Sequence, residues 1–469
     1  MPDPATPNED RSLDHSIDEH ALAAATSDNP QGVASRIEEL PAADGAAVML
    51  GLSRDMSAEV AEYLDPNTAG SILAEMDPTL AASVISDMEE AEASMVLAAM
   101  DPDDRVDILA HVPQALHDRL VSEMDAEEAA EVRDLEQYPR DTAGGIMTTE
   151  VTALSEDFTV EQAISELRRL NEELEQMFYV YVVDKRKHLV GVLSMRDLIL
   201  ARPERPITEI MRHNVTSVPV TMDQEEVARL IRKYNYLAVP VVDARNRLAG
   251  LITVDDVVDV IQEEATEDVQ KMFGAGAEER LGSPWTYSFK KRVWWLQVNL
   301  GTAFLAAWVM MQFDTVIGAL PVLAAYQSVV SGMGGNAGAQ ALAVAIRGMA
   351  LGESAHSLLG RVLYRETIVG LMTGLSVGFV TWACAALHLF GLSKYEQYNP
   401  ILVGGVICLA LTLNHIVAGV TGVLIPFLMR RLGFDPAQSA TIFATTFTDC
   451  GGFFLTLWLA QKLILAHHV

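Results

Sequence analysis

A single carboxylate, that of Asp449, stands out in the last long apolar segment of the chain. It is the only charged side chain between Asp435 and Lys462, inside a run from Ala437 to Leu459 that is apolar enough to cross a membrane. A charge at that depth is costly unless it faces water, a cation or a partner helix. Asp449 is therefore a candidate ion-binding residue, and an Asp that pairs with another helix for packing is the alternative.

Two segments of the apolar part combine glycine with polar side chains. The first runs from Ser331 to Gln340 and the second from Thr445 to Gly452. Glycine lets helix backbones approach closely, whereas Asn and Thr oxygens need water or polar partners at membrane depth. Tight helix packing would account for the glycines alone, and a hydrated pore accounts for both features. The residues expected to line such a pore beside Asp449 are Gly334, Gly335, Asn336 and Thr448.

A second group of carboxylates lies on an acidic segment, residues 254–268. Spacings of three, four and eight place Asp256, Asp259, Glu263 and Glu267 on one face of a helix. Like charges stacked in this way destabilise a helix unless cations or bases lie opposite them. The segment indicates a cation-binding face, and a merely solvated face is the alternative.

The net charge of −31 belongs to the part of the chain before Lys290, because only six of the 64 acidic residues follow that position. A field of this sign repels nucleic acid and attracts cations, although solubility alone would also explain it. The three cysteines lack metal-site spacing. The sequence contains no phosphate loop, no His-Glu-x-x-His and no nucleophile with a matching base, so it does not predict an enzyme.

The soluble part contains two kinds of repeat. Residues 1–38 are rich in Pro, Asp, Ser and Ala and are expected to be disordered. In residues 39–138 an apolar residue recurs every twelve positions, and pairs such as Asp65-Pro66 and Asp77-Pro78 follow it. Asp caps a helix and Pro suits its first turn, so this acidic domain is expected to be a superhelix of short helices.

The second repeat lies in residues 139–262. Val182-Val183-Asp184 recurs as Val241-Val242-Asp243, and each copy is followed by a glycine, Gly191 or Gly250, within a second apolar run. Each copy predicts an amphipathic helix, two short strands and another helix. The pattern resembles a pair of α/β CBS modules.

The remainder divides into an acidic connecting helix, residues 263–289, and a membrane domain, residues 290–469. Five uncharged runs in the membrane domain are long enough to span a bilayer. Lys and Arg cluster before span one, between spans two and three and between spans four and five. Bases favour the cytoplasmic side, so we expect a cytoplasmic N-terminus and an external C-terminus in a multi-pass protein of the inner or plasma membrane.

The order of these parts resembles the MgtE magnesium channel and transporter family. The resemblance runs from about residue 38 to the end and includes Gly-Gly-Asn-Ala-Gly-Ala-Gln at 334–340, Ile-Arg-Gly-Met-Ala-Leu-Gly-Glu at 346–353 and Phe-Thr-Asp at 447–449. It implies an α-helical superhelix, an α/β CBS pair, a connecting plug helix and an all-α domain of five transmembrane helices.

The resemblance also implies a homodimer whose pore follows the two-fold axis, with Asp449 of each subunit facing Mg²⁺. Mg²⁺ demands octahedral oxygen geometry and sheds water reluctantly, so the two carboxylates are expected to contact a hydrated ion. Size separates Mg²⁺ poorly from Mn²⁺, Co²⁺ or Ni²⁺, so a transporter for those ions stays open as an alternative.

By the same resemblance the cytosolic acidic surfaces sense Mg²⁺ and close the channel when internal Mg²⁺ is sufficient. The positions that match the regulatory sites of the family are Asp103, Asp107, Asp256, Asp259, Glu264, Glu267 and Asp268. Tyr179, Arg196 and Asp197 match positions that bind ATP, and plain packing is the alternative there. The alternative from a different functional class is a non-conducting membrane sensor that detects Mg²⁺ or a nucleotide through the CBS pair.

Overall fold

The computed structural model describes residues 29–170, 179–277, 279, 283–350, 355–387, 398–438 and 440–467. Contacts divide the chain into two units, Met1–Ile261 and Gln262–Val469. Residues 1–28 of the expected disordered start lie outside the described residues.

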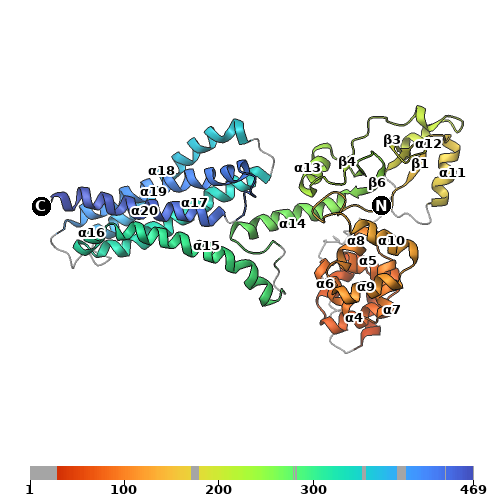
Figure 1. Ribbon diagram of the computed structural model, residues 1–469, viewed down its shortest axis with the longest axis horizontal. Coiled ribbons are helices and arrows are strands. Elements are labelled where there is room, and N and C mark those ends of the chain that lie inside the picture. The colour runs from red at the N-terminus through yellow and green to blue at the C-terminus, as the bar shows by residue number, and fades with distance from the viewer. Residues whose placement is uncertain are drawn as a thin grey trace, which may run out of the picture. The chain divides into compact units, whose positions relative to one another are not determined.

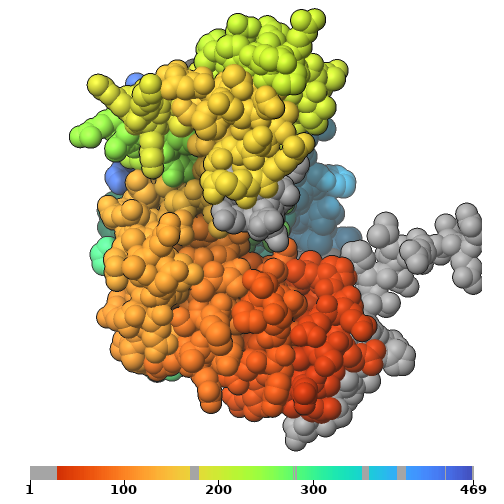
Figure 2. Space-filling view, turned by 90° about the vertical axis from the view of Figure 1, so that its right-hand side faces the viewer, coloured from red at the N-terminus to blue at the C-terminus, as the bar shows by residue number. Residues whose placement is uncertain are grey.

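Among the described residues, the first unit begins with a series of short helices, several of them labelled in Figure 1. They are α2 (Pro30–Ile37), α3 (Ala42–Leu50), α4 (Arg54–Tyr63), α5 (Pro66–Ala74), α6 (Pro78–Asp87), α7 (Glu90–Ala98), α8 (Pro102–Leu109), α9 (Gln114–Glu123) and α10 (Ala126–Leu135). The carboxylates of Asp65 and Asp77 accept hydrogen bonds from first-turn N–H groups, and a proline follows each. The repeating apolar side chains, among them Met76 and Met100, are buried in one core. The twelve-residue period therefore predicted this superhelix, which Figure 2 shows as a densely packed red and orange body.

Helix α2 begins earlier than expected, inside the segment that we expected to be disordered. The side chain of Asn29 accepts a hydrogen bond from the N–H of Gly32 at 3.2 Å and caps the helix. Val33 and Ile37 are fully buried in the superhelix core. The expected boundary at residue 39 is wrong, since the ordered domain includes residues from Pro30 onward.

In the described residues, the CBS pair consists of two three-stranded sheets with the same topology. Strands β1 (Ala153–Ser155), β2 (Tyr179–Val183) and β3 (Leu189–Ser194) form one sheet, and β4 (Val218–Pro219), β5 (Ala238–Val242) and β6 (Leu248–Thr253) form the other. In each, the first two strands are parallel and the last two antiparallel. The helices of the pair are α11 (Val160–Leu170), α12 (Met195–Leu200), η1 (Ile207–Glu209) and α13 (Gln224–Tyr234).

The repeated glycines and methionines of the CBS pair interlock the two modules. A Cβ atom on Gly191 would lie 2.4 Å from the sulfur of Met211, and one on Gly250 would lie 2.7 Å from the sulfur of Met147. Each methionine precedes one module and packs on a glycine of the other. The constraint is stronger at Gly250, where a Cβ atom would also lie 2.6 Å from the carbonyl oxygen of Thr148, because a backbone atom cannot move aside as a methionine side chain can.

Helix α14 (Val254–Met272) is a single helix of 19 residues that follows β6 directly. It therefore starts inside the range expected for the CBS pair, and the described chain between Met272 and Pro284 is not helical. The expected connecting helix over residues 263–289 is thus correct only in its first half. Met272 is buried among Leu342, Ile425 and Ala440 of the second unit.

The second unit contains α15 (Trp285–Met311), α16 (Asp314–Ala319), α17 (Val322–Ala350), α18 (Ala355–Ala386), α19 (Pro400–Arg431), α20 (Ala440–Leu463) and η3 (Leu465–His467). Five stretches in the described residues are long and apolar enough to cross a membrane: α15, α17, Leu359–Ala386 of α18, α19 and α20. Their number agrees with the five spans expected. The most buried is α19, which packs against α17, α18 and α20.

Candidate ion-binding and regulatory sites

Asp449 lies in the middle of α20, and its carboxylate makes a hydrogen bond to a neighbouring helix. The hydroxyl of Ser331 on α17 donates to Asp449 Oδ1 at 2.6 Å. No described basic side chain forms an ion pair with Asp449, which is half-buried. One hydroxyl satisfies only part of the hydrogen-bonding capacity of a carboxylate, so the remaining lone pairs are available to water or to a hydrated cation.

The contact between α17 and α20 continues one turn further along both helices. A Cβ atom on Gly335 would lie 3.6 Å from the Cγ2 atom of Thr445, so Gly335 and Thr445 pack next to Ser331 and Asp449. The side of α17 beyond this contact is exposed. Its residues follow each other at intervals of four, and they are Ser328, Gly332, Asn336, Gln340 and Val344.

Thr448 and Gly334, two of the expected pore-lining residues, are buried inside the helix packing. Thr448 has no exposed surface, and its hydroxyl donates to the carbonyl of Thr445 at 2.9 Å. A Cβ atom on Gly334 would lie 3.4 Å from the Cβ atom of Thr448. Thr448 and Gly334 therefore pack between helices and present no surface to a pore. Asn336, in contrast, is exposed, and Gly335 is half-buried.

Asn414 on α19 is a polar residue that the sequence analysis missed. It is fully buried, and its Nδ2 atom donates to the carbonyl of Val330 at 3.2 Å. Cβ atoms on Gly334 and Gly452 would lie 2.3 Å and 2.7 Å from that nitrogen. The two glycine-rich segments thus make room for one amide at the junction of α17, α19 and α20. The sequence signal that could have identified Asn414 is a polar amide side chain inside a long apolar run.

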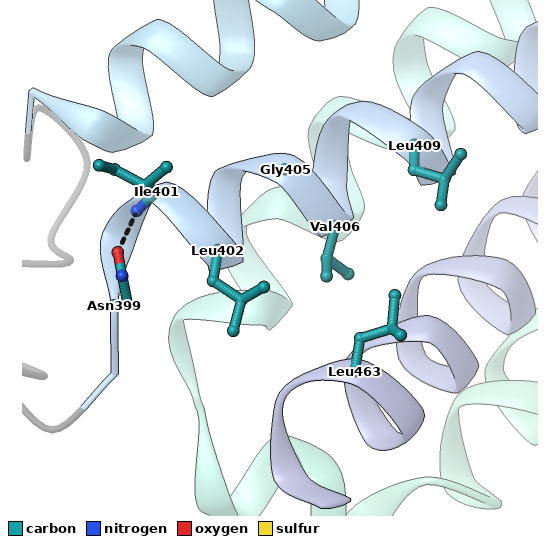
Figure 3. Close-up of a pocket in the computed structure, with 7 residues that line it drawn as sticks. All are labelled: Asn399, Ile401, Leu402, Gly405, Val406, Leu409 and Leu463. Carbon is teal, nitrogen blue, oxygen red and sulfur yellow. Dashed lines mark hydrogen bonds between the residues drawn. The ribbon is translucent and has the colours of Figure 1, made fainter. Parts of the chain in front are cut away.

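A groove of about 400 Å³ lies at the start of α19 (Figure 3). Leu402, Val406 and Leu409 line it together with Leu463 of α20. The only polar side chain among its lining residues, Asn399, accepts a hydrogen bond from the N–H of Ile401 at 2.9 Å. Asp449 is not among its lining residues, so the groove is separate from the Asp449 site.

The first unit brings acidic residues of α8 together with Asp256 on α14. Burial, reinforced by the nearby charges of Asp256, Asp104 and Asp101, raises the pKa of Asp103 well above its usual range. Burial, together with the charges of Asp256 and Asp101, raises the pKa of Asp104 to about 8. Burial is the main cause of both shifts, and the charges of the neighbouring carboxylates add to it.

Asp107 and Asp256 belong to the same acidic group. Burial raises the pKa of Asp107, although Arg140 and His111 oppose the shift. Burial also raises the pKa of Asp256, and hydrogen bonds from Thr253 oppose that shift. We call the five residues Asp103, Asp104, Asp107, Asp256 and Asp101 the acidic cluster.

The acidic cluster fits a hydrated cation better than a bare one. Within the described residues, no three Asp, Glu, His or Cys side chains converge closely enough to enclose a metal ion. Asp103 Oδ1 is nevertheless buried without a hydrogen-bond partner. A buried carboxylate oxygen without a donor is costly, and the water shell of Mg²⁺ would supply donors across the remaining distance.

The other expected regulatory residues lie further along α14. Burial and the charge of Asp255 raise the pKa of Asp259. Glu267 forms an ion pair with Lys271, which also contacts Asp435 between α19 and α20 at 3.0 Å. Glu264 and Asp268 are half-buried on the same helix. Glu267 therefore already has a cationic partner.

The expected nucleotide residues meet at the start of α12. Tyr179 pairs with Ser194 across β2 and β3, which places the half-buried tyrosine beside the helix that begins with Met195. Ser194 donates to Asp197 Oδ2 at 2.7 Å, as Thr253 donates to Asp256 in the second module. Arg196 is exposed next to them. The three residues are close together, and one carboxylate oxygen of Asp197 already accepts a hydrogen bond from Ser194, the residue that caps α12.

Comparisons with known proteins agree with this architecture. The MgtE intracellular N domain matches residues 40–141, CBS domains match 143–204 and 207–263, and the MgtE divalent cation transporter domain matches 327–459. A magnesium transporter MgtE from Enterococcus faecalis is 39% identical over 69% of this chain and 69% of its own length.

A second relative and one solved structure extend the comparison. The magnesium transporter MgtE of Bacillus subtilis is 32% identical over 92% of this chain and 93% of its own length. A crystal structure of the cytosolic domain of the Mg²⁺ channel MgtE in complex with ATP is 36% identical and covers 51% of this chain and 98% of its own, with a TM-score of 0.49. The chain belongs to the MgtE family of magnesium transporters.

Proposed function

We propose that this protein is a homodimeric Mg²⁺ channel in which Asp449 of each subunit faces a hydrated ion, and that cytosolic Mg²⁺ closes it. The observation that carries the proposal is the half-buried Asp449 carboxylate, which has no basic partner among the described residues. A membrane helix keeps such a group where it meets water or an ion.

The exposed face of α17 supports a second subunit and a hydrated path. Asn336 and Gln340 are exposed on that face of the single chain, beside the contact of α17 with α20. Their amide groups would be unsatisfied against lipid, where each lost hydrogen bond costs several kcal/mol, ~2–7 by transfer data. Covering the face with a second copy around a water-filled path satisfies them.

The acidic cluster supports regulation by cytosolic Mg²⁺. Crowded carboxylates with raised pKa values favour either protonation or a bound divalent cation, and Mg²⁺ between them would hold α8 against the start of α14. Without Mg²⁺, repulsion between the same charges opposes that contact. Several weak sites acting together could supply the roughly 5 kcal/mol that a nearly complete closure requires.

Helix α14 supports a direct mechanical link between sensor and pore. Its first turn carries Asp256, and its last turn carries Lys271 and Met272, which contact membrane-domain residues. A continuous helix transmits displacement at one end to the other because its backbone hydrogen bonds resist bending. Binding at the acidic cluster would thus alter the position of Met272.

The proposal includes a cytoplasmic location for the soluble part and a nucleotide site on the CBS pair. Lys290, Lys291 and Arg292 at the start of α15 and Arg430 and Arg431 at the end of α19 support that orientation. The placement of Tyr179, Arg196 and Asp197 at one helix start supports ATP as the nucleotide, with the ring for the base and Asp197 for ribose hydroxyls. Titration with ATP at millimolar concentration tests this part separately.

The test of the main proposal is Mg²⁺ uptake into proteoliposomes with internal Mg²⁺ clamped low or high. We expect uptake by the wild type at low internal Mg²⁺, suppression at high internal Mg²⁺ and loss of uptake in Asp449→Asn. Asp314→Asn is the matched control, because Asp314 is an exposed acid at the start of α16. The double variant Asp103→Asn, Asp256→Asn should conduct but respond less to internal Mg²⁺.

Three results would redirect the proposal. Absence of uptake by folded, dimeric wild type would favour a non-conducting sensor. Uptake by Asp449→Asn at the wild-type rate would give Asp449 a packing role. Stronger uptake of Co²⁺, Mn²⁺ or Ni²⁺ than of Mg²⁺ would assign the transport to those ions.

A further inference from the structure

We propose that Ser331 is the positioning residue that orients the Asp449 carboxylate, and that its hydroxyl makes the site discriminate against cations that bind carboxylates directly, such as Ca²⁺ and Mn²⁺. The inference rests on the proposed function, since it assigns to Asp449 the contact with the transported ion. It adds a residue of α17 that acts through Asp449 and not on the ion itself.

The geometry of the Ser331–Asp449 pair is that of a strong hydrogen bond. The donor and acceptor oxygens are 2.6 Å apart and belong to residues 118 positions apart in the sequence. Short O–H···O⁻ bonds of this kind are stronger than neutral ones. The bond uses Oδ1 and leaves Oδ2 as the freer oxygen of the carboxylate.

The backbone that carries Ser331 is itself fixed by a buried contact. Asn414 donates to the carbonyl of Val330, the residue immediately before Ser331, at 3.2 Å and has no exposed surface. On the other side, a Cβ atom added to Gly335 would lie 3.6 Å from the Cγ2 atom of Thr445, one turn before Asp449, so α17 and α20 lie close together there. Ser331 is therefore presented from a rigid three-helix junction, as a positioning group requires.

The hydroxyl changes what kind of cation ligand Asp449 can be. A donor on Oδ1 draws charge from that oxygen and restrains rotation of the carboxylate, which disfavours two-oxygen chelation of a bare ion. Ca²⁺ commonly takes carboxylates in that two-oxygen mode, whereas Mg²⁺ keeps several waters and contacts the site through them. A restrained carboxylate with one free oxygen suits the hydrated ion.

Removing the hydroxyl should release that restraint. In Ser331→Ala, both oxygens of Asp449 become free to chelate, so Ca²⁺ and Mn²⁺ should bind more tightly while hydrated Mg²⁺ gains little. We expect the Ca²⁺ concentration that halves Mg²⁺ uptake to fall by about tenfold, the factor associated with one hydrogen bond to a charged group. Ser331→Thr retains the hydroxyl and should restore the wild-type value to within about twofold.

The experiment uses full-length protein in proteoliposomes and measures Mg²⁺ uptake against increasing external Ca²⁺ and, separately, Mn²⁺. Ser376→Ala is the matched control, because Ser376 is an exposed serine on α18 and the substitution removes the same atom. Ser331→Cys, which keeps the side-chain volume but donates weakly, replaces Ser331→Ala if that variant does not elute as a folded dimer. The cysteine variant should also show an increased sensitivity to Ca²⁺.

The outcomes separate this inference from the proposed function. If the wild type takes up no Mg²⁺, the proposed function fails and the role of Ser331 fails with it. If the wild type conducts and Ser331→Ala has the wild-type sensitivity to Ca²⁺ and Mn²⁺, the inference alone is overturned. Equal changes in Ser331→Ala and Ser331→Thr would also overturn it, because they would indicate a packing effect and not loss of the donor.

Discussion

The ammonium group of Lys271 on α14 lies 3.0 Å from Asp435 Oδ2, in the connection between α19 and α20. The same ammonium pairs with Glu267, one turn earlier on α14. Burial disfavours its charge, but the hydrogen bonds to Glu267 and Asp435 outweigh burial and raise the pKa of Lys271. Lys271 thus remains charged at physiological pH and ties the end of α14 to the membrane domain.

Neutralising either partner of this ion pair should weaken the response to internal Mg²⁺. Lys271→Met and Asp435→Asn should each raise the half-closing Mg²⁺ concentration about twofold to fivefold, the range for a partly exposed ion pair. Asp435 also accepts a hydrogen bond from the N–H of Ala437 at 2.8 Å, and the side-chain oxygen of Asn in Asp435→Asn can still accept it. The measurement is Mg²⁺ uptake as a function of internal Mg²⁺.

The double variant decides whether the two residues act together. The double variant Lys271→Met, Asp435→Asn should raise the half-closing Mg²⁺ concentration no further than the larger single change does. The reason is that one interaction can be lost only once. Fully additive shifts would show that the residues act independently. Lys462→Met, at an exposed base near the end of α20, serves as the control.

Magnesium binding at the acidic cluster should release a proton. Burial and the charges of Asp256, Asp101 and Asp107 raise the pKa of Asp104 to about 8, so at pH 7 this carboxyl is mostly protonated without a cation. Protonated Asp104 stabilises the compact cluster. This contribution is fully present below pH 3.8, the ordinary pKa of the group, and is lost as the pH rises through about 8. Bound Mg²⁺ should therefore contribute most to the stability of the compact cluster above about pH 8.

Asp104 alone should contribute roughly 0.9 proton per subunit at pH 7, as expected for a single group of this pKa. Calorimetry of Mg²⁺ binding in buffers of different ionisation enthalpy measures it. Asp104→Asn should remove that contribution from the measured release, and Glu59→Gln, at an exposed acid on α4, should leave the release unchanged. Proton release that is unchanged in Asp104→Asn would mean that Asp104 does not titrate in this range.

Most of the architecture could be predicted from the sequence because it is repetitive. The twelve-residue period gives the superhelix, the duplicated Val-Val-Asp segments give the CBS pair, and uncharged runs give the five membrane helices. Strands β1 and β4 have only three and two residues, so they carry no alternation of their own and were not predicted. Their pairing depends on β2 and β5, which the tertiary fold brings alongside.

The details that could not be predicted depend on which side of a helix meets a neighbour. Thr448 and Asp449 are adjacent in sequence, yet the first is fully buried and the second is half-buried. The composition around Val33 suggested disorder because burial of that side chain depends on core residues of later helices. Asn414 was overlooked since only the packing shows that two glycines surround it.

The buried Arg105 should be a main determinant of stability in the superhelix. Its guanidinium donates to the carbonyls of Leu97 at 2.7 Å and Met100 at 2.8 Å, and only 4% of the residue is exposed. Arg105→Met should lower the free energy of unfolding by about 3 kcal/mol, because buried carbonyls lose their donors. Thermal unfolding of the full chain measures this.

The control for Arg105 is Arg54, which pairs with Asp87 on the surface of the same domain. Arg54→Met should cost less than about 1 kcal/mol, as exposed ion pairs do. Equal destabilisation by the two substitutions would contradict a structural role specific to Arg105.

The glycines around Asn414 should tolerate no added methyl group. A Cβ atom at Gly334 would lie 2.3 Å from Asn414 Nδ2, and one at Gly452 would lie 2.7 Å from it, distances that require a backbone or side-chain shift. Gly334→Ala and Gly452→Ala should each destabilise the membrane domain by about 1–3 kcal/mol, the usual cost of overpacking. Gly301→Ala on α15, where nothing lies within 4 Å, should leave stability nearly unchanged.

The cause can be isolated by shortening the side chain that the methyl would meet. Asn414→Ala alone should be destabilising, since it removes the donor to the Val330 carbonyl. Combined with Gly334→Ala, however, it should cost less than the sum of the two single changes, because the clash no longer exists. Thermal unfolding of the four proteins in detergent measures the cycle. Strict additivity would place the strain of Gly334→Ala at another contact, such as the one with Thr448 at 3.4 Å.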